Sequence, residues 1–325
     1  NKNNKINKND ININNNNNED NTNNNLNIQL DGKTSYFISQ SDKVILENKY
    51  NYSIMYYIQV MFCCLFQNAK KKFSKEIKAK NLVLAHGNFA QLDRIVESHK
   101  QFYGFNAVDG IVADIGLSSY QLDDSNRGIT FQKLEPLDMR FDISSPEPDA
   151  RFMLNEYSEE KLTQIFREYG EEKESKRIAH GIVKARESKQ LHYTTDLLEV
   201  IQQALPKPVQ HKWKDSARRI FQALRIAVNH ELENLETFLP KALDIVKPGG
   251  VIVIVSFHSL EDRIVKQFFL ESAKGCICPK EFPICLCNQT PQVEILTRKI
   301  VTADEQELKE NSRSASAKLR AIRKL

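Results

Sequence analysis

Apolar runs and amphipathic stretches alternate regularly from residue 81 onwards. The short apolar run at 82–85 predicts a strand, and a polar loop follows at 86–89. Residues 89–99 have the helical period, and the apolar run at 110–114 predicts the next strand. Strand, helix and strand at this spacing predict a parallel α/β sheet.

Residues 123–215 have the helical period throughout. In the first of three predicted helices, Leu162, Ile165 and Phe166 fall on one face, and Ser158 is a suitable N-cap. Two further amphipathic stretches follow, and the second ends at closely spaced prolines. No strand pattern interrupts them, so the sequence predicts a small all-helical domain inserted into the α/β domain.

The α/β pattern resumes after the insertion. Residues 217–239 predict one long amphipathic helix, KPGG follows at 247–250, and the β-branched run at 251–257 predicts a buried strand. Ser259 and Asp262 have capping-box spacing, which predicts that another helix begins there. Helix, glycine pair and buried strand are typical of a late crossover in a doubly wound sheet.

The predicted organisation has four parts. The asparagine-rich residues 1–30 contain too few apolar side chains to offset the entropy of ordering, so we expect them to be disordered. Residues 31–80 fit no part of the α/β pattern. The α/β domain comprises residues 81–122 and 216–325, and residues 123–215 are the inserted helical domain.

Composition narrows the functional classes only slightly. The 325 residues have a formal net charge of +4, which permits a nucleic-acid partner without arguing for one. The longest dense apolar run, at 54–66, is shorter than the roughly 20 residues that span a bilayer, so we predict no membrane association. A targeting segment, a buried strand or helix, and sequence foreign to the fold all remain open for this run.

The cysteines are clustered, which favours local chemistry in a reducing compartment over a disulfide framework. Two C-x-C pairs with six residues between them are formed by Cys276, Cys278, Cys285 and Cys287. Four clustered thiols can bind zinc tetrahedrally. Because these pairs are closer than the usual C-x₂-C, we favour the absence of a metal, with a structural zinc at these four cysteines as the alternative.

Three polar clusters follow predicted strands. They are HGNF at 86–89, DIGLSSYQLDD at 114–124 and FHSLEDR at 257–263. In an open parallel sheet, ligands bind beyond the carboxyl ends of the strands. We therefore expect the three clusters to converge on one ligand site.

These clusters occur in a fixed order with EPLDMRFD, RIAHGIV, FQALRIAVNHEL and SRSASAKLR. Over residues 81–325 the set resembles the small-subunit ribosomal RNA cytosine-N4 methyltransferase family, of the MraW or RsmH type. The resemblance implies a class I, Rossmann-like methyltransferase fold. It also implies S-adenosylmethionine as methyl donor, and a cytosine of small-subunit ribosomal RNA as acceptor.

The resemblance implies donor contacts for Phe89, Asp114 and Gln121, where the aromatic ring can stack on adenine. The family also has a glycine-rich loop after its first strand and an acidic residue ending its second strand. Residues 1–80 supply neither. We therefore expect that residues 1–80 are not the natural N-terminal part of this domain. The alternative is a catalytically silent ribosomal RNA-binding homologue that has lost its donor loop.

The cytosine N4 amine is a poor nucleophile because its lone pair is delocalised into the ring. An acceptor for an N4–H bond would restore density on nitrogen. Asp114 is the first candidate for this role, with donor contact as its competing assignment. Ser118 is expected to orient a base that has left its stack. His258 is either an active-site group or a packed histidine, and Asn229 either faces the cleft or lies on a helix surface.

The helical insertion and the basic tail at 312–325 are the segments expected to hold RNA, through phosphate contacts. Asp138 and Arg140 are predicted to form a structural ion pair that fixes the insertion. The resemblance implies a cytoplasmic localisation. A mitochondrion or plastid is expected if the asparagine tract marks a eukaryotic source, and the oligomeric state stays open, a homodimer included.

Overall fold

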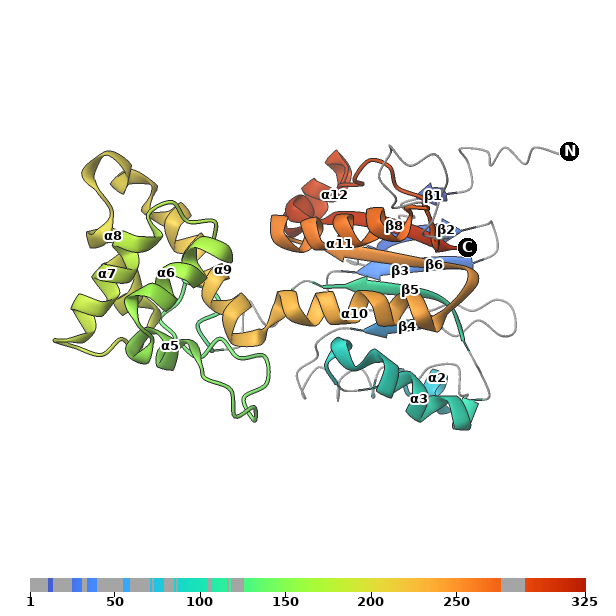
Figure 1. Ribbon diagram of the computed structural model, residues 1–325, viewed down its shortest axis with the longest axis horizontal. Helices are drawn as coiled ribbons and strands as arrows, with labels where there is room; N and C mark the ends of the chain where they lie inside the picture. Colours follow the sequence, from blue (N-terminus) through green and yellow to red (C-terminus); the bar gives the residue numbers. More distant parts are fainter. Residues whose placement is uncertain are drawn as a thin grey trace, which may run out of the picture. The chain divides into compact units, whose positions relative to one another are not determined.

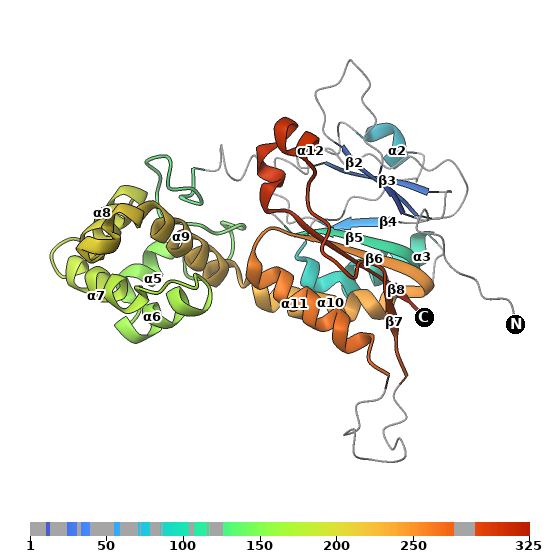
Figure 2. The same ribbon diagram turned by 90° about the horizontal axis from the view of Figure 1, so that it is seen from above.

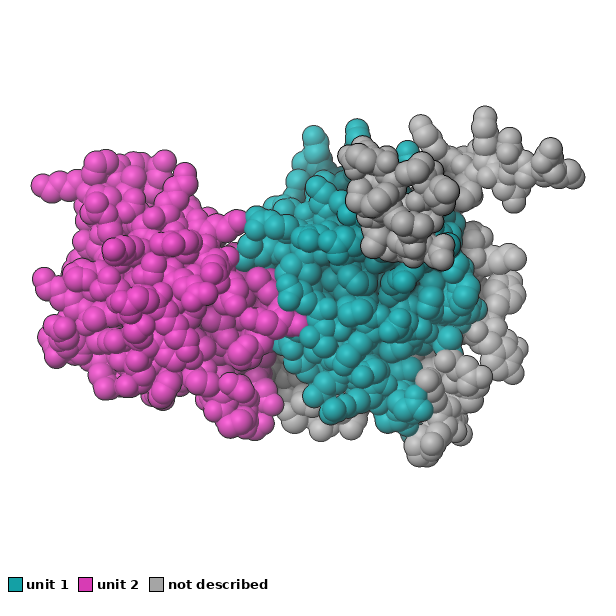
Figure 3. Space-filling model, viewed as in Figure 1, with its two compact units in different colours: residues 1–118, 234–325 teal, residues 119–233 magenta. Residues whose placement is uncertain are grey.

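The computed structural model describes residues 11–13, 25–30, 34–39, 55–58, 71, 73–78, 85, 87–103, 107–115, 117, 126–275 and 290–325. The chain divides into two compact units (Figure 3). The α/β unit comprises residues 1–118 and 234–325, and the helical unit comprises residues 119–233. Among the described residues, none of the helices combines the length and apolar character needed to cross a membrane.

A five-stranded sheet forms the centre of the α/β unit (Figure 1). Its strands lie in the order β4 (Met55–Ile58), β5 (Val108–Asp114), β6 (Val246–Ser256), β8 (Lys318–Lys324) and β7 (Val293–Ile295). The first three strands are parallel, whereas β8 runs antiparallel to β6 and β7 runs antiparallel to β8. The predicted Rossmann-like α/β class is confirmed, with the correction that the sheet is mixed.

The strand predicted at 82–85 lies almost entirely outside the described residues, and a strand that the sequence did not predict precedes β5 in the sheet. Of the predicted strand at 82–85, only Ala85 is described, and it is not in a strand. Strand β4 instead pairs with β5, with Met55 opposite Gly110. Because β4 lies inside the apolar run at 54–66, the strand alternative for that run holds for these four residues.

Three short strands form a separate antiparallel sheet in the order β1 (Ile11–Ile13), β2 (Asn25–Leu30) and β3 (Thr34–Ser39). Residues 1–30 were expected to be disordered, and β1 and β2 fall within them. The segment NLNIQL alternates polar and apolar residues, which is the period of a strand. The other residues of 1–30 lie outside the described part of the chain.

Both faces of the central sheet are buried, which explains the near-continuous apolar runs of β5 and β6. Ile111 and Ile252 point to one face and Val112 and Val253 to the other, as the strand period of two requires. The first face is covered by three helices, α3 (Leu92–Tyr103), α10 (Glu231–Ile245) and α11 (Ser259–Ser272) (Figure 2). The pairing between strands and the packing on both faces of the sheet therefore hold the ends of β5 and β6 in fixed positions.

The helical unit packs its helices around one apolar core. They are α5 (Ala150–Glu156), α6 (Glu159–Glu168), α7 (Ser175–Arg186), α8 (Thr194–Ala204) and α9 (Trp213–Asn229). The predicted start of α6 is confirmed, because Ser158 Oγ accepts a hydrogen bond from Lys161 N at 3.2 Å. The predicted boundary between residues 215 and 216 falls inside α9, which the structure groups with the helical unit.

The single helix predicted at 217–239 is two helices, and that prediction was wrong. His230 has left-handed φ and ψ of 52° and 41° and separates α9 from α10. Such a residue commonly ends a helix. Arg225 then reaches past the break to Glu231 with two hydrogen bonds of 2.7 and 2.9 Å. The apolar period continues through the break, so the pattern did not reveal it.

Strand β8 comes from the segment predicted to be a basic tail for RNA. Its Leu319, Ala321 and Ile322 are buried, and they alternate with basic residues that obscure the strand pattern. Arg320 forms a bidentate ion pair with Asp262 of α11, with N–O distances of 2.6 and 3.0 Å. Lys324 donates to the backbone oxygen of Leu243 at 2.7 Å. At these positions the tail serves the fold, and the RNA contact predicted for the rest of the tail stays a prediction.

The Arg320–Asp262 pair is expected to stabilise the α/β unit measurably, since the two side chains are only 13% and 15% exposed. Asp262→Asn should lower the free energy of unfolding by about 2 kcal/mol, because Arg320 keeps its charge and loses its carboxylate partner. Urea unfolding followed by circular dichroism measures this difference.

The matched control is Glu294→Gln, which breaks the more exposed pair of Glu294 with Arg323 in the same sheet. Its cost should stay below about 1 kcal/mol. In an Arg320→Met background, Asp262→Asn should cost much less than in the parent. An equal cost in both backgrounds would show that the pair does not carry the effect.

Candidate functional site

The carboxyl ends of β5 and β6 lie side by side at one edge of the sheet. Asp114, the last residue of β5, is paired in register with Val255 of β6. Ile115 N then donates to Val255 O at 3.0 Å, which continues the pairing one step further. The Asp114 residue is 5% exposed. A buried carboxylate thus stands at the edge where parallel sheets bind ligands.

A short 3-10 helix, η1 (Phe89–Gln91), supplies an aromatic ring to the same unit. The Asn88 side chain caps it by accepting a hydrogen bond from Ala90 N at 2.9 Å. Asn88 also donates to Asn234 Oδ1 of α10 at 3.1 Å. The half-buried Phe89 ring packs edge-on against Phe238, with centroids 5.4 Å apart. The sequence singled out Phe89 but gave no signal for the Asn234 contact.

The start of α11 is held by a capping box of His258 and Glu261. Glu261 Oε2 accepts hydrogen bonds from the N–H of Phe257 at 2.9 Å and of His258 at 3.3 Å. The His258 side chain accepts from Glu261 N at 3.4 Å. The capping box predicted for Ser259 and Asp262 was therefore wrong by one residue. The Asp262 carboxylate is instead used in the ion pair with Arg320 of β8.

His258 also has a ring nitrogen that the capping box does not use. Nε2 is buried and lies 3.2 Å from Glu261 Oε1, but the geometry is not that of a hydrogen bond. Within the described residues this nitrogen has no other hydrogen-bond partner. A buried polar atom in that state is typical of a position that meets a ligand or water. His258 thus packs at the start of α11 and also has a polar ring nitrogen at the carboxyl edge of the sheet.

Asn229 belongs to the helical unit, where its side chain holds a loop. Its Oδ1 accepts from Phe141 N at 2.7 Å, and its Nδ2 donates to the backbone oxygens of Met139 at 2.8 Å and Arg225 at 2.9 Å. These bonds engage the amide's oxygen and nitrogen. Asn229 therefore holds residues 139–141, and its predicted catalytic contact stays a prediction.

The predicted Asp138–Arg140 ion pair is confirmed in the same loop. Arg140 Nε and Nη2 donate to Asp138 Oδ1 and Oδ2, both at 2.9 Å. Arg140 Nη1 donates to Ser145 O, also at 2.9 Å. Burial by itself raises the pKa of the Asp138 carboxyl, but hydrogen bonds from the Arg140 side chain and backbone hold that pKa below its ordinary value.

The glycine of the motif SNRG has a structural role that sequence reasoning missed. Gly128 has a φ of 70°, and a Cβ there would lie 2.5 Å from Pro136 O. Its N–H donates to the buried Glu135 Oε2 at 2.8 Å. Arg127 donates to the backbone oxygens of Arg140 and Phe141, both at 3.0 Å. Two motifs that are separate in the sequence therefore interlock in the helical unit.

Several predicted site residues lie outside the described residues. They are Ser118, Gln121 and the four cysteines Cys276, Cys278, Cys285 and Cys287. Their assignments stay predictions. Of the predicted residues in the α/β unit, the structure describes Phe89, Asp114 and His258, and the last two stand at neighbouring strand ends.

The sheet and its polar carboxyl edge have the architecture of a Rossmann-like α/β domain with a ligand site at the strand ends. The model of the MraW methylase family matches residues 62–325, so the chain belongs to the MraW methylase family. This confirms the resemblance noted from the motifs, and the match begins upstream of residue 81.

Curated bacterial relatives agree with this family. The ribosomal RNA small subunit methyltransferase H of Pelobacter propionicus is 51% identical over 245 residues, covering 74% of this chain and 76% of its own length. The protein of the same name from Heliobacterium mobile is 47% identical over 257 residues, covering 79% and 81%. That from Carboxydothermus hydrogenoformans is 45% identical over 238 residues, covering 73% and 75%.

The lowered pKa of Asp138 predicts an acid-dependent loss of stability in the helical unit. The pair contributes stability above the ordinary pKa of about 4, and this contribution is lost as the pH falls through the lowered folded pKa. Asp138→Asn should therefore reduce stability at pH 7 by about 1–3 kcal/mol and weaken its dependence on pH below about 4. Trp213, the single tryptophan, lies against the helical core and reports this unit by fluorescence.

Asp215→Asn is the matched control, because it breaks an exposed pair with Arg218 in the same unit. It should change stability at pH 7 by less than about 0.5 kcal/mol. Parallel stability curves for wild type and Asp138→Asn between pH 2 and pH 7 would contradict the assignment of Asp138.

Proposed function

We propose that this protein transfers a methyl group from S-adenosylmethionine to the exocyclic N4 of a cytosine in small-subunit ribosomal RNA. Family membership supports methyl transfer, and the names of the bacterial relatives support ribosomal RNA as acceptor. The structural observation that carries the proposal is the buried Asp114 carboxylate at the carboxyl end of β5, next to the strand that ends before His258.

The described residues of this edge fit the methyl donor chemically. The donor carries a positive sulfonium, and the 5%-exposed Asp114 offers a carboxylate of opposite charge. The half-buried Phe89 ring, supported on its edge by Phe238, offers an apolar surface for a purine. The buried Nε2 of His258 offers a polar atom whose hydrogen-bonding capacity is available. When bound, the donor supplies an electrophilic methyl carbon for in-line displacement.

The protein must chiefly orient the amine and accept its hydrogen bond. In our proposal Asp114 accepts an N4–H hydrogen bond and would take that proton as the new N–C bond forms, while the S–C bond of the donor would break and leave a neutral thioether. Water is kept from this carboxylate by the burial of the strand end. Donor contact is the competing role for Asp114, and the two roles predict different kinetics. Ser118 and Gln121 keep their proposed roles in orienting the base and contacting the donor.

His258 and Asn229 receive different roles. His258 is held at the sheet edge by its capping box, so we place its Nε2 at the ligand. Asn229 acts indirectly, by holding the loop at 139–141 in the helical unit. We further propose that residues 119–233 are the unit that recognises RNA. The relatives named above carry methyltransferase names, which gives no support to the alternative of a silent RNA-binding homologue.

The proposed localisation of the protein follows from its proposed substrate. The relatives are bacterial, and a protein acting on small ribosomal subunits of that type would meet them in the cytoplasm of a bacterium. In a eukaryote the same substrate would lie in a mitochondrion or a plastid. A homodimer stays a prediction.

Substitution of Asp114 tests the proposed chemistry. Asp114→Asn should lower kcat for methylation of unmodified small-subunit ribosomal RNA by about 100-fold or more, since the amide is a weaker acceptor for the N4–H. If the carboxylate acts on the amine, the Kd of S-adenosylmethionine from calorimetry should stay within about 3-fold of wild type. A donor role would instead raise that Kd. Mass spectrometry of digested RNA should identify N4-methylcytosine.

Asp109→Asn is the matched control, because Asp109 stands at the opposite end of β5 in an ion pair with Lys247. It should keep at least half of the wild-type activity. Wild-type turnover by Asp114→Asn would refute the role of Asp114, and a methylated product other than N4-methylcytosine would refute the reaction.

A further inference from the structure

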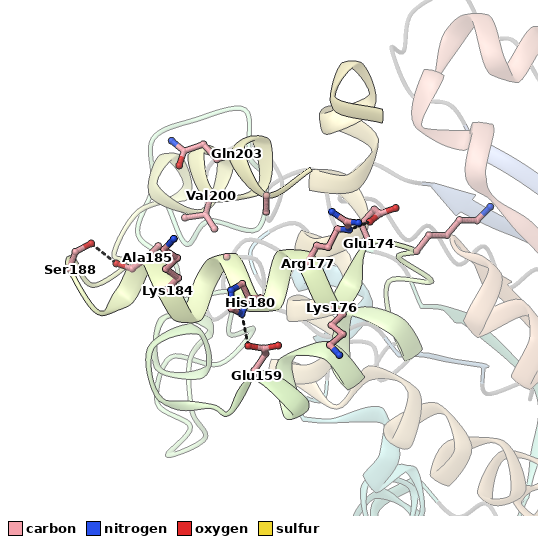
Figure 4. A pocket seen from close by; sticks show the side chains of 13 residues that line it. Glu159, Glu174, Lys176, Arg177, His180, Lys184, Ala185, Ser188, Val200 and Gln203 are labelled. Carbon is pink, nitrogen blue, oxygen red and sulfur yellow. Dashed lines mark hydrogen bonds and ion pairs between the residues drawn. The ribbon is translucent and has the colours of Figure 1, made fainter. Parts of the chain in front are cut away.

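The helical unit carries a hollow between α7 and α8 with a volume of about 990 Å³ (Figure 4). We call it the α7 groove. Its apolar lining is made of small side chains, Gly181 and Ala185 from α7 and Val200 and Ala204 from α8. All of its lining residues belong to residues 119–233.

Gly181 sets how closely the two helices approach. A Cβ at this position would lie 3.0 Å from the Cβ of Ala204 and 3.4 Å from Cγ1 of Val200. Glycine thus lets α8 approach α7 without a side chain between them. The result is a shallow apolar strip, with charged residues of α7 beside it.

The charge around the α7 groove is predominantly positive. Helical spacing places the exposed Lys176, Arg177 and Lys184 of α7 along it, and Lys173 lies just before the helix. Figure 4 shows Lys176, Arg177 and Lys184 on the same helix as His180.

The two glutamates that line the groove are already engaged. Glu174 pairs with Arg177 at 3.2 Å, and Glu159 contacts the His180 ring at 2.9 Å. Among the described residues, no carboxylate lies within ion-pair distance of Lys173, Lys176 or Lys184. The pKa of Glu160 is lowered, first by its backbone hydrogen bond and least by the charge of Lys176. The three lysines therefore keep their charge available to an anionic ligand.

We propose that the α7 groove binds the sugar-phosphate backbone of the RNA substrate, with Lys173, Lys176 and Lys184 contacting phosphates. This inference rests on the proposed function and adds the surface that anchors the RNA. A positively charged groove can follow a nucleic-acid backbone, and the small side chains of the strip leave room for the sugars between the phosphates. Lysine is a point charge without directional pairing, so this surface positions the RNA and does not read its sequence.

The test is a triple variant, Lys173→Gln, Lys176→Gln and Lys184→Gln, measured for binding of unmodified small-subunit ribosomal RNA at several salt concentrations. Loss of three phosphate contacts should reduce the slope of log K against log salt by about 2, since each contact on single-stranded RNA contributes about 0.7. Affinity at about 0.1 M salt should fall roughly 100-fold, because a slope difference of about 2 acts over the decade of salt below 1 M, where counterion release hardly favours binding.

Two matched variants separate position from charge. Replacing the exposed Lys207, Lys212 and Lys214 by glutamine removes the same charge from the helical unit outside the groove, and it should leave the salt slope near the wild-type value. Replacing the three groove lysines by arginine keeps the charge and should restore binding. Circular dichroism checks that each variant is folded, since Lys214 lies over the Trp213 ring and its replacement would itself alter the fluorescence.

Equal loss of affinity in the two glutamine variants, or an unchanged salt slope in the groove variant, would overturn the groove as the RNA contact. An unchanged slope would also indicate that the groove binds another class of ligand, such as an acidic peptide. Methyl transfer by the wild-type protein is measured separately. Its absence would refute the proposed function, whereas normal methylation with an unchanged slope refutes only the groove.

Discussion

The parallel pairing of β5 with β6 is the constraint on which the proposed site depends. The register places Asp114 opposite Val255, so the strand ends coincide at one edge of the sheet. Hydrogen-bonded neighbours on both sides and burial on both faces hold β5 and β6 in the centre of the sheet. A carboxylate at the end of such a strand is held in place by the core beneath it.

The second fixed point is the start of α11. Glu261 satisfies the backbone N–H groups of Phe257 and His258, and it is itself 2% exposed. The neighbouring Asp262 is engaged by Arg320 from β8, so the last strand of the chain braces the helix that follows β6. Two adjacent acidic residues thus have different structural tasks, and together they hold His258 at the sheet edge.

The helical unit shows how residues in motifs can be structural. Asn229, Asp138 and Arg140 form a network that fixes the loop at 139–141, and Gly128 has a conformation that favours glycine. Motifs of a methyltransferase family therefore contain residues that shape the helical unit as well as residues proposed for chemistry. The exposed lysines of α7, Lys176 and Lys184, lie outside this network and line the α7 groove.

The sequence by itself determined the α/β class, the helical insertion, the family and the carboxylate at the end of a buried strand, because these follow from local periodicity and from short motifs. Only the tertiary structure decided the position of β4, the break at His230 and the conversion of the basic tail into β8. The physical reason is that each of these depends on partners distant in the sequence. Strand pairing and the Arg320–Asp262 contact stabilise conformations that the local sequence pattern does not predict.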